Sequence, residues 1–176
     1  AVQSPKQTDE LAAGAMVGHY RVSGTLGRGG FAWVYEAQDS RTGQPAAVKV
    51  LDRPPNNQDA DEFNERFLRE ARTIGTLKHP NIVEVYDFGV ADTGRPYMAM
   101  ELLQGHDLER ELERHGVLEP ERARNLFGGA LDALGTAHGQ GIVHKDLKPT
   151  NLFIADPRGP GERLVLVDFG IAWAMT

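Results

Sequence analysis

The sequence predicts an α+β protein whose two halves differ in character. Short runs of β-type residues alternate with turn residues in the first half, whereas the second half is dominated by the three-to-four-residue periodicity of amphipathic helices. A glycine-rich turn joins two of the strand candidates rather than a strand and a helix. With 176 residues, of which 40% are hydrophobic and 25% are charged, the chain is able to bury a core of ordinary size.

The first half is expected to contain strands and one helix. The strand candidates are residues 20–26, 32–37, 46–51, 82–90 and 96–103. Between the third and fourth strands, apolar residues recur every three or four positions, which predicts a helix that ends at His79 and Pro80. Its inward-facing residues are Phe63, Phe67, Ala71, Ile74 and Leu77. Tight turns between successive strands favour an antiparallel sheet.

The second half is expected to be mainly helical. A short helix is predicted at residues 107–115, and Pro120 opens a longer helix that ends near Gly139. The residues of this longer helix expected to face inward are Ala123, Phe127, Ala130, Leu131 and Leu134. Two apolar runs, residues 152–154 and 164–167, flank a Pro/Gly turn and predict a β-hairpin. Residues 1–18 are polar and then rich in Ala and Gly, so they are expected to form a flexible tail.

Composition excludes several classes of function. The formal net charge of −6, without blocks of like charge, argues against nucleic acid or an anionic membrane as the main partner. The absence of cysteine excludes disulfides, a thiolate nucleophile and cysteine-based metal sites, and it fits a cytoplasmic location. No run approaches about 18 apolar residues, so no membrane segment is expected in this chain, although the full-length protein could carry an anchor elsewhere.

The glycine-rich turn at residues 27–34 and Lys49 each allow two interpretations. Gly27 and Gly29 let backbone amides approach phosphate oxygens closely, but a glycine hairpin without any ligand is an equally good reading of the turn alone. Lys49 lies among apolar residues in a predicted strand, so its ammonium group needs an anionic partner, and Glu70 on the following helix is the candidate. Taken singly, a lysine that reaches water and a solvated helix glutamate are the commoner outcomes.

Two polar segments in the second half decide between these interpretations. Residues 144–151 read HKDLKPTN, and residues 167–170 read VDFG. Together with the glycine-rich turn, Lys49 and Glu70, in that order, they resemble the motif set of the protein kinase family. From about His19 to its end, the chain is similar to the bacterial serine/threonine kinases of eukaryotic (Hanks) type.

This resemblance implies a protein-kinase-like bilobal fold. Residues 19–100 would form a complete N-lobe, with a five-stranded antiparallel sheet and one helix, after the tail at residues 1–18. Residues 101–176 would form the hinge and the start of a mainly helical C-lobe, truncated just after the Asp-Phe-Gly segment. A start at Ala1 rather than Met also fits a piece of a longer protein. Without the rest of the C-lobe, an apolar face of the helix that begins at Pro120 would be exposed.

The resemblance also implies roles in phosphoryl transfer. Asp146 would orient the substrate hydroxyl and accept its proton, and Lys148 would stabilise the charge of the γ-phosphoryl group. Lys49, held by Glu70, would contact the α- and β-phosphates of ATP. A lysine at position 148 is typical of kinases that act on Ser/Thr rather than Tyr.

Ligand residues follow from the same resemblance. Asn151 and Asp168 would hold Mg²⁺, with Mn²⁺ as the alternative ion, through hard oxygen atoms. Backbone groups of Glu101 and Leu103 would pair with the adenine edge, and Asp107 would hydrogen-bond the ribose. The full set expected to bind ATP is Leu26, Gly27, Gly29, Val34, Ala47, Lys49, Met100, Glu101, Leu103, Asp107 and Leu152.

Other positions match the family or depart from it. Four residues match a stack of side chains that couples the helix carrying Glu70 to the Asp-Phe-Gly segment: Ile74, Val85, His144 and Phe169. His144 is therefore interpreted as a packed histidine rather than a base. Ala32 replaces the third glycine of the loop. Lys145 stands where most kinases that are activated by loop phosphorylation carry Arg, and it lacks the bidentate fork of Arg.

The implied function is ATP-dependent transfer of the γ-phosphate to Ser/Thr hydroxyls of proteins. Its partners would be ATP and protein substrates, and a homodimer for autophosphorylation of the full-length protein is left open. The alternative is a nucleotide-binding or scaffolding module without catalysis, similar to a pseudokinase. Because every charged residue that the chemistry needs is present, the sequence favours the enzyme for the parent protein.

Overall fold

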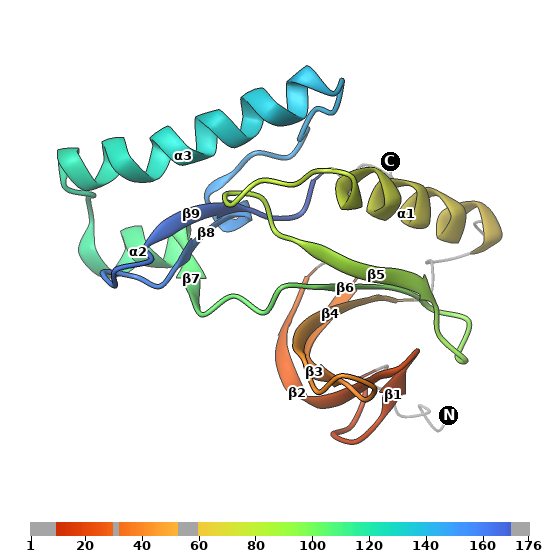
Figure 1. Cartoon of the computed structure of the whole chain (residues 1–176). Helices are drawn as coiled ribbons and strands as arrows, with labels where there is room; N and C mark the ends of the chain where they lie inside the picture. Colours follow the sequence, from red (N-terminus) through yellow and green to blue (C-terminus); the bar gives the residue numbers. More distant parts are fainter. Residues whose placement is uncertain (1–9, 30–31, 53–59, 170–176) are drawn as a thin grey trace, which may run out of the picture.

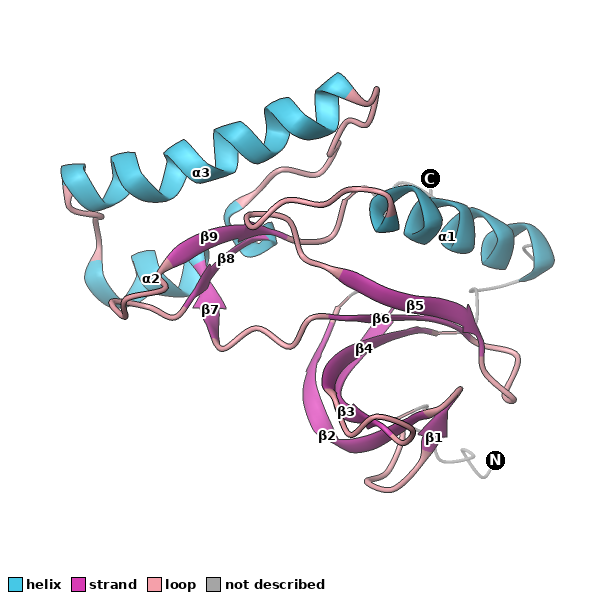
Figure 2. Cartoon of the chain, in the orientation of Figure 1, coloured by secondary structure: helices cyan, strands magenta, loops and turns pink. Residues whose placement is uncertain are grey.

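The protein forms two parts joined by a short extended segment (Figure 1). The computed structural model describes residues 10–29, 32–52 and 60–169; the side chains of Phe63 and Glu70 lie outside this description. The amino-terminal part, residues 10–100, is a curled antiparallel sheet with one helix over it. The carboxy-terminal part, residues 101–169, contains two α-helices and a small sheet within the described residues (Figure 2).

The large sheet has six strands in the order β1-β2-β3-β4-β6-β5, and every neighbouring pair is antiparallel. Its strands are β1 (Met16–Val17), β2 (Tyr20–Arg28), β3 (Ala32–Asp39), β4 (Pro45–Leu51), β5 (Val85–Val90) and β6 (Pro96–Met100). The prediction of five strands is wrong by one. The additional strand, β1, lies in the segment expected to be a tail, because Val17 pairs with Tyr20 and is only 1% exposed.

The alternation of β4 places Lys49 toward the carboxy-terminal part. Ala46, Val48 and Val50 point into one buried cluster, which the curl of the sheet encloses together with strands β1 to β3. Ala47 and Leu51 belong to the other cluster, which contains the helix α1 and much of the carboxy-terminal part. Since side chains alternate along a strand, Lys49 shares this second face with Ala47 and Leu51.

Helix α1 (Ala60–Gly75) packs against β5 and β6 on this second face. The described residues predicted to face inward, from Phe67 to Leu77, are at most 4% exposed. The loop after the helix connects the two parts. In this loop Val83 donates to Leu166 O at 3.0 Å, and Leu166 donates to Asn81 O at 2.8 Å. Because these residues pair with the second sheet, β5 begins at Val85 and not at residue 82 as predicted.

The carboxy-terminal part is built around a three-stranded sheet in the order β7-β8-β9. Its elements are β7 (Gly105–Asp107), α2 (Leu108–His115), α3 (Pro120–Gly139), the 3-10 turn η1 (Pro149–Asn151), β8 (Leu152–Ala155) and β9 (Arg163–Leu166). The predicted hairpin is confirmed as β8 and β9. Strand β7 was not predicted; Gly105 lets it approach β8, since a Cβ there would lie 2.0 Å from Ile154 O.

Helix α3 presents apolar side chains on two sides. The buried residues are Leu126, Ala130, Ala133 and Ala137, and this side packs against β9. Phe127 and Leu131, predicted to face inward, are instead 36% and 66% exposed. Small alanine side chains allow the close approach to the sheet, and the bulkier residues lie on the outer side. Among the described helices, none combines the length and apolar character needed to cross a bilayer.

Candidate active site

The segment between α3 and β8 gathers three polar side chains. Asp146 Oδ2 accepts hydrogen bonds from Asn151 Nδ2 at 3.0 Å and lies 3.0 Å from Lys148 Nζ. Asn151 Nδ2 also donates to the backbone oxygen of Asp146 at 2.9 Å, and Asn151 is only 5% exposed. Lys145, immediately before Asp146, has a φ of 64°, a left-handed conformation that is uncommon outside glycine. The turn therefore fixes the Asp146 carboxylate beside an amide and an ammonium group.

His144 supports this turn from inside the fold. Its Nε2 lies 2.9 Å from Val167 O, and the backbone N–H of Asp146 donates to its Nδ1 at 3.3 Å. This pattern assigns the proton to Nε2. Burial lowers the pKa of His144 below its ordinary value of 6.5, and its ring lies 4.5 Å from that of Phe169. His144 is thus a packed, hydrogen-bonded histidine, as expected from the sequence, and it also contacts the backbone of Asp146.

Lys49 forms an ion pair with Asp168 across the two parts of the chain. Its Nζ lies 2.6 Å from Asp168 Oδ1, and the lysine side chain is 13% exposed. Asp168 has a φ of 56°, and Ile74, Val85, His144 and Phe169 are all at most 8% exposed. Glu70 belongs to α1, but its side chain lies outside the described residues, so the expected pair of Lys49 with Glu70 stays a prediction.

The β8–β9 hairpin brings the two charged groups together. Because Leu152 pairs with Leu166 in antiparallel register, Asn151 just before β8 and Asp168 just after β9 emerge at the same end of the hairpin. Val167 N donates to Asn151 O at 3.1 Å. A continuous set of short contacts therefore runs from Asp146 through Asn151 and the Val167 backbone to Asp168 and Lys49.

The donor set at this end of the hairpin fits a hard divalent cation. Asn151 uses its amide nitrogen for Asp146, which leaves its side-chain oxygen directed elsewhere, and Asp168 has a second carboxylate oxygen besides the one at Lys49. Within the described residues, no cluster of three or more His, Asp or Glu side chains forms a complete metal cage. A pair of oxygen ligands suits Mg²⁺, which usually keeps water and substrate phosphates in its shell.

The residues expected around adenine lie in one apolar cluster. Ala47, Met100 and Leu152 are each 7% exposed, and Val34 and Leu103 pack against the same cluster. The register of the sheet opposes Ala47 to Met100 and Val34 to Lys49, so these side chains share a face. They come from both parts of the chain and line the junction between them.

Two polar residues, Glu101 and Asp107, lie in the segment that follows β6. The Glu101 N–H donates to Glu84 O at 2.8 Å, which leaves the Glu101 carbonyl for other contacts. Asp107 caps α2, since its Oδ1 accepts from Arg110 N at 2.8 Å. The segment 101–107 therefore offers backbone groups and one carboxylate next to an apolar surface.

The glycine-rich turn is described up to Gly29 and again from Ala32. Gly27 pairs with Val34, and Gly29 N donates to Ala32 O at 2.8 Å. Nothing lies within 4 Å of a Cβ built at Gly27, and Leu26 is 51% exposed. Ala32 is 4% exposed in β3 rather than at the tip of the turn; the expected phosphate-covering tip, residues 30–31, falls outside the described residues.

Sequence reasoning missed an ionic network in the carboxy-terminal part. Buried Glu111 in α2 contacts Arg122 in α3, and Arg122 also contacts Glu162 before β9. Glu111 and Arg122 are 11 positions apart in the sequence, and Arg122 and Glu162 are 40 apart, so no spacing pattern predicts this network. Arg163 was missed for the same reason; it lies 2.7 Å from Glu101 and donates to Pro80 O at 3.0 Å.

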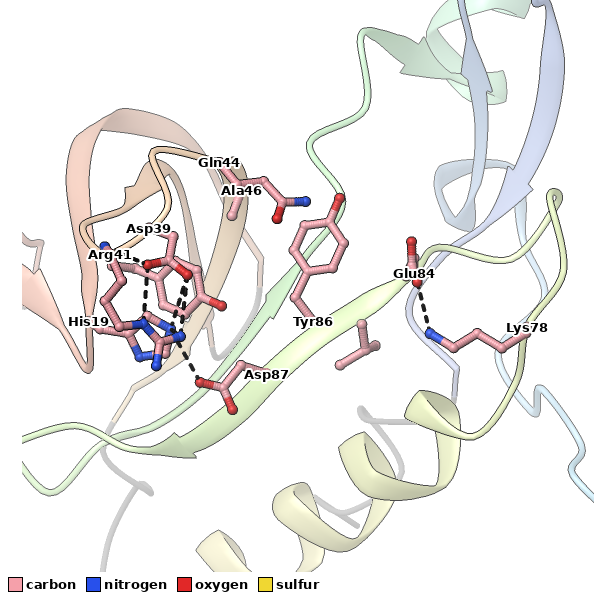
Figure 3. A pocket seen from close by; sticks show the side chains of 11 residues that line it. His19, Asp39, Arg41, Gln44, Ala46, Lys78, Glu84, Tyr86 and Asp87 are labelled. Atoms are coloured by element: carbon pink, nitrogen blue, oxygen red, sulfur yellow. Dashed lines mark hydrogen bonds and ion pairs between the residues drawn. The ribbon is translucent and has the colours of Figure 1, made fainter.

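A polar cavity of about 490 Å³ lies elsewhere, between the β3–β4 turn and β5 (Figure 3). Figure 3 shows that its charged groups already pair with one another: Arg41 with Asp39, and Lys78 with Glu84. The hydrogen bond from Arg41 lowers the pKa of Asp39 to about 2. None of the residues predicted to bind ATP or metal lines this cavity, so it is separate from the candidate active site.

Comparisons with known proteins agree with this geometry. The family model described as protein kinase domain matches residues 20–176. Serine/threonine-protein kinase PknH from Mycobacterium bovis is 39% identical over 163 residues, which are 93% of this chain and 26% of PknH. PknE from the same organism is 38% identical over 96% of this chain and 29% of its own length. Serine/threonine-protein kinase pkn3 from Myxococcus xanthus is 36% identical, over 94% of this chain and 30% of its own.

A solved structure shares the fold. The crystal structure of the PknI kinase domain from Mycobacterium tuberculosis matches with a TM-score of 0.78 and 31% identity, covering 93% of this chain and 64% of that domain. The chain therefore spans less than a third of the curated relatives named above and about two thirds of a solved kinase domain.

Proposed function

Because this chain belongs to the protein kinase family, we propose that it carries the ATP site and catalytic residues of a serine/threonine protein kinase. The observation that carries the proposal is the continuous set of contacts that joins Asp146, Asn151, Asp168 and Lys49. Phosphoryl transfer needs positioned charges more than covalent chemistry, and these residues supply charges of both signs in one place. The coverage of the PknI domain supports the view that the chain is one portion of a longer kinase domain.

In the proposed reaction, Asp146 orients the hydroxyl of a Ser or Thr residue and accepts its proton as the bond to phosphorus forms. Lys148, 3.0 Å from Asp146, offsets the negative charge of the γ-phosphoryl group. His144 holds the Asp146 backbone and, being neutral and buried, does not compete for the proton.

Nucleotide binding in this proposal divides between the two parts of the chain. Ala47, Val34 and Leu152 enclose adenine, and the Glu101 and Leu103 backbones pair with its edge. The remaining residues of the proposed ATP site are Leu26, Gly27 and Gly29 over the phosphates, Met100 behind adenine and Asp107 at the ribose.

Asn151 and Asp168 would hold Mg²⁺. When bound, this ion would neutralise charge on the β- and γ-phosphates. The Lys49–Asp168 pair, at 2.6 Å, neutralises both groups in the nucleotide-free chain. Lys49 must therefore turn from Asp168 toward the α- and β-phosphates when ATP binds, and Glu70 is the residue proposed to hold it there.

The pseudokinase alternative receives no support from a specific observation. A non-catalytic module would not need Asp146, Lys148 and Asn151 to converge, yet their side chains lie within hydrogen-bonding distance. The catalytic proposal accounts for this arrangement directly.

The test is Mg²⁺-dependent phosphate transfer from ATP to a Ser/Thr peptide. It compares a longer polypeptide, which continues this chain through the remainder of the kinase domain, with its Asp146→Asn variant. We expect kcat to fall at least about 100-fold in the variant, the usual contribution of a general base, while ATP affinity changes less than about threefold. Asp92→Asn, in the exposed β5–β6 turn, is the matched control and should keep full activity. ATP binding without any transfer by the parent polypeptide would refute the catalytic proposal and favour the alternative.

A further inference from the structure

We propose that Glu111, Arg122 and Glu162 form a positioning network for Asp107, the residue assigned to the ribose of ATP. This inference rests on the proposed function, because it concerns the same nucleotide site. None of the three residues belongs to the kinase motifs identified in the sequence. They come from α2, from α3 and from the turn before β9, and they join these elements behind the site.

Glu111 is the centre of the network. It is 1% exposed, and its Oε1 accepts a hydrogen bond from Arg122 Nη1 while its Oε2 lies 2.5 Å from His106 Nε2. His115 and Arg158 also face this carboxylate, at 3.9 and 3.7 Å from Oε1. Burial works to raise the pKa of Glu111, but the hydrogen bonds from Arg122 and His106 outweigh it and lower the pKa to about 2.

Arg122 extends the network to the turn of the β8–β9 hairpin. Its Nη2 lies 2.7 Å from Glu162 Oε1, and its Nε donates to the same carboxylate at 3.1 Å. Glu162 Oε1 also accepts from the backbone N–H of Arg158 at 2.7 Å, which fixes the β8–β9 turn. Contacts with Glu162 raise the pKa of Arg122, so the arginine stays charged.

Glu111 is one of the two buried side chains through which helix α2 is held in place. The helix has eight residues, and its only buried side chains are Leu108 and Glu111. A helix of this length is not stable on its own in water. Glu111 lies one turn from Asp107, whose Oδ1 caps the helix at Arg110 N. His106, the neighbour of Asp107, also contacts Glu111. Asp107 is therefore restrained by the helix that follows it and by the residue that precedes it.

Glu111 therefore fixes the position of Asp107 through α2 and His106. If the charge of Glu111 is removed, Arg122 retains Glu162, but α2 loses its strongest attachment to α3. We expect the first turn of α2 to loosen and the second oxygen of Asp107 to lose its fixed direction. The consequence should be confined to the ribose hydroxyl groups, because the apolar residues around adenine belong to other elements.

The experiment compares ATP with 2′,3′-dideoxy-ATP, which lacks the hydroxyl groups that Asp107 would contact. Binding of each nucleotide to this chain in Mg²⁺ is measured by calorimetry, and thermal melting confirms that each variant is folded. A hydrogen bond to a charged group corresponds to roughly tenfold or more in affinity, so wild type should prefer ATP about tenfold. Asp107→Ala should reduce the preference to about one, and Glu111→Gln to below about threefold.

Glu113→Gln is the matched control, since Glu113 lies exposed on the same helix; its preference for ATP should equal that of wild type. If Glu111→Gln does not fold, Arg122→Lys replaces it. Lys keeps the charge but lacks the fork that bonds two carboxylates, so the preference should again fall. Folded variants that keep the wild-type preference overturn the positioning proposal alone. A wild-type chain that binds neither nucleotide overturns the proposed function, and the inference with it.

Discussion

Replacing Gly105 with Ala should destabilise the protein far more than glycine replacements at comparable turns. Gly105 has a φ of 150°, and an added Cβ would lie 2.0 Å from Ile154 O, a backbone atom that cannot rotate away. The backbones of β7 and β8 would have to separate by about 1 Å to reach the 3.0 Å that real Cβ atoms respect. That separation strains or breaks the hydrogen bonds of the three paired positions, each contributing about 0.5–1.5 kcal/mol.

The expected cost is therefore about 3 kcal/mol or more, once backbone strain of about 1 kcal/mol is included. For a chain of this size, 1 kcal/mol corresponds to about 2–4 °C in Tm, so Gly105→Ala should lower Tm by about 6–12 °C. The assay is thermal unfolding followed by circular dichroism, with urea unfolding as a second measurement of the free energy.

Alanine variants of two other glycines distinguish the cost of steric overlap from the cost of backbone strain. Gly116 ends α2 with a φ of 77°, but nothing lies within 4 Å of its Cβ position, so Gly116→Ala should cost only about 1 kcal/mol. Gly128 lies within α3, exposed and with open space around it, so Gly128→Ala should stabilise the helix by about 0.5–1 kcal/mol. A Gly105→Ala variant that melts at the temperature of Gly116→Ala would refute the steric argument.

Three further predictions concern charge and packing. Since the pKa of Glu111 falls from 4.5 to about 2 on folding, its contribution to stability is complete above pH 4.5 and is lost as the pH falls toward 2. Urea unfolding should therefore show a larger loss of stability over this range in wild type than in Glu111→Gln, which keeps the low-pKa carboxyl of Asp39. His144 should titrate below 6.5 in an NMR experiment, and a value above 6.5 would contradict its burial as a neutral ring. Phe67→Ala should lower the free energy of unfolding by about 3–5 kcal/mol, because Phe67 is 1% exposed. Leu131 is 66% exposed, so Leu131→Ala should change the same free energy by less than about 0.5 kcal/mol.

The large sheet could be predicted because its strands carry their own signal. In β4, alternate residues enter two different buried clusters, and in α1 the buried residues recur at helical spacing. Strands β1 and β7 could not be predicted in the same way, since they have two and three residues and exist only through pairing with a neighbour. The orientation of α3 was ambiguous because both of its sides carry apolar residues, and only packing against β9 selects the alanine side.

In the candidate site too, some features could be predicted from the sequence and others could not. The resemblance to the kinase motif set grouped Asp146, Asn151 and Asp168, and in the structure the β8–β9 hairpin brings Asn151 and Asp168 to the same end. From the sequence, Glu70 alone was predicted as the partner of Lys49, although the element that carries Asp168 also faces it. Which of them it contacts depends on tertiary geometry, and Asp168 is the partner in the described residues. The network around Glu111 depends entirely on such geometry.

The loop at residues 79–83 connects the two parts of the molecule by hydrogen bonds to the second sheet. Asn81 Nδ2 donates to Leu164 O at 2.8 Å, His79 lies 2.9 Å from Asp132, and Val83 is bonded to Leu166. These bonds attach the segment that leads into β5 to β9, the strand after which Asp168 follows. We therefore expect the start of β5 and the end of the hairpin to keep their relative position, so that Asp168 has a fixed place relative to the loop that joins the two parts.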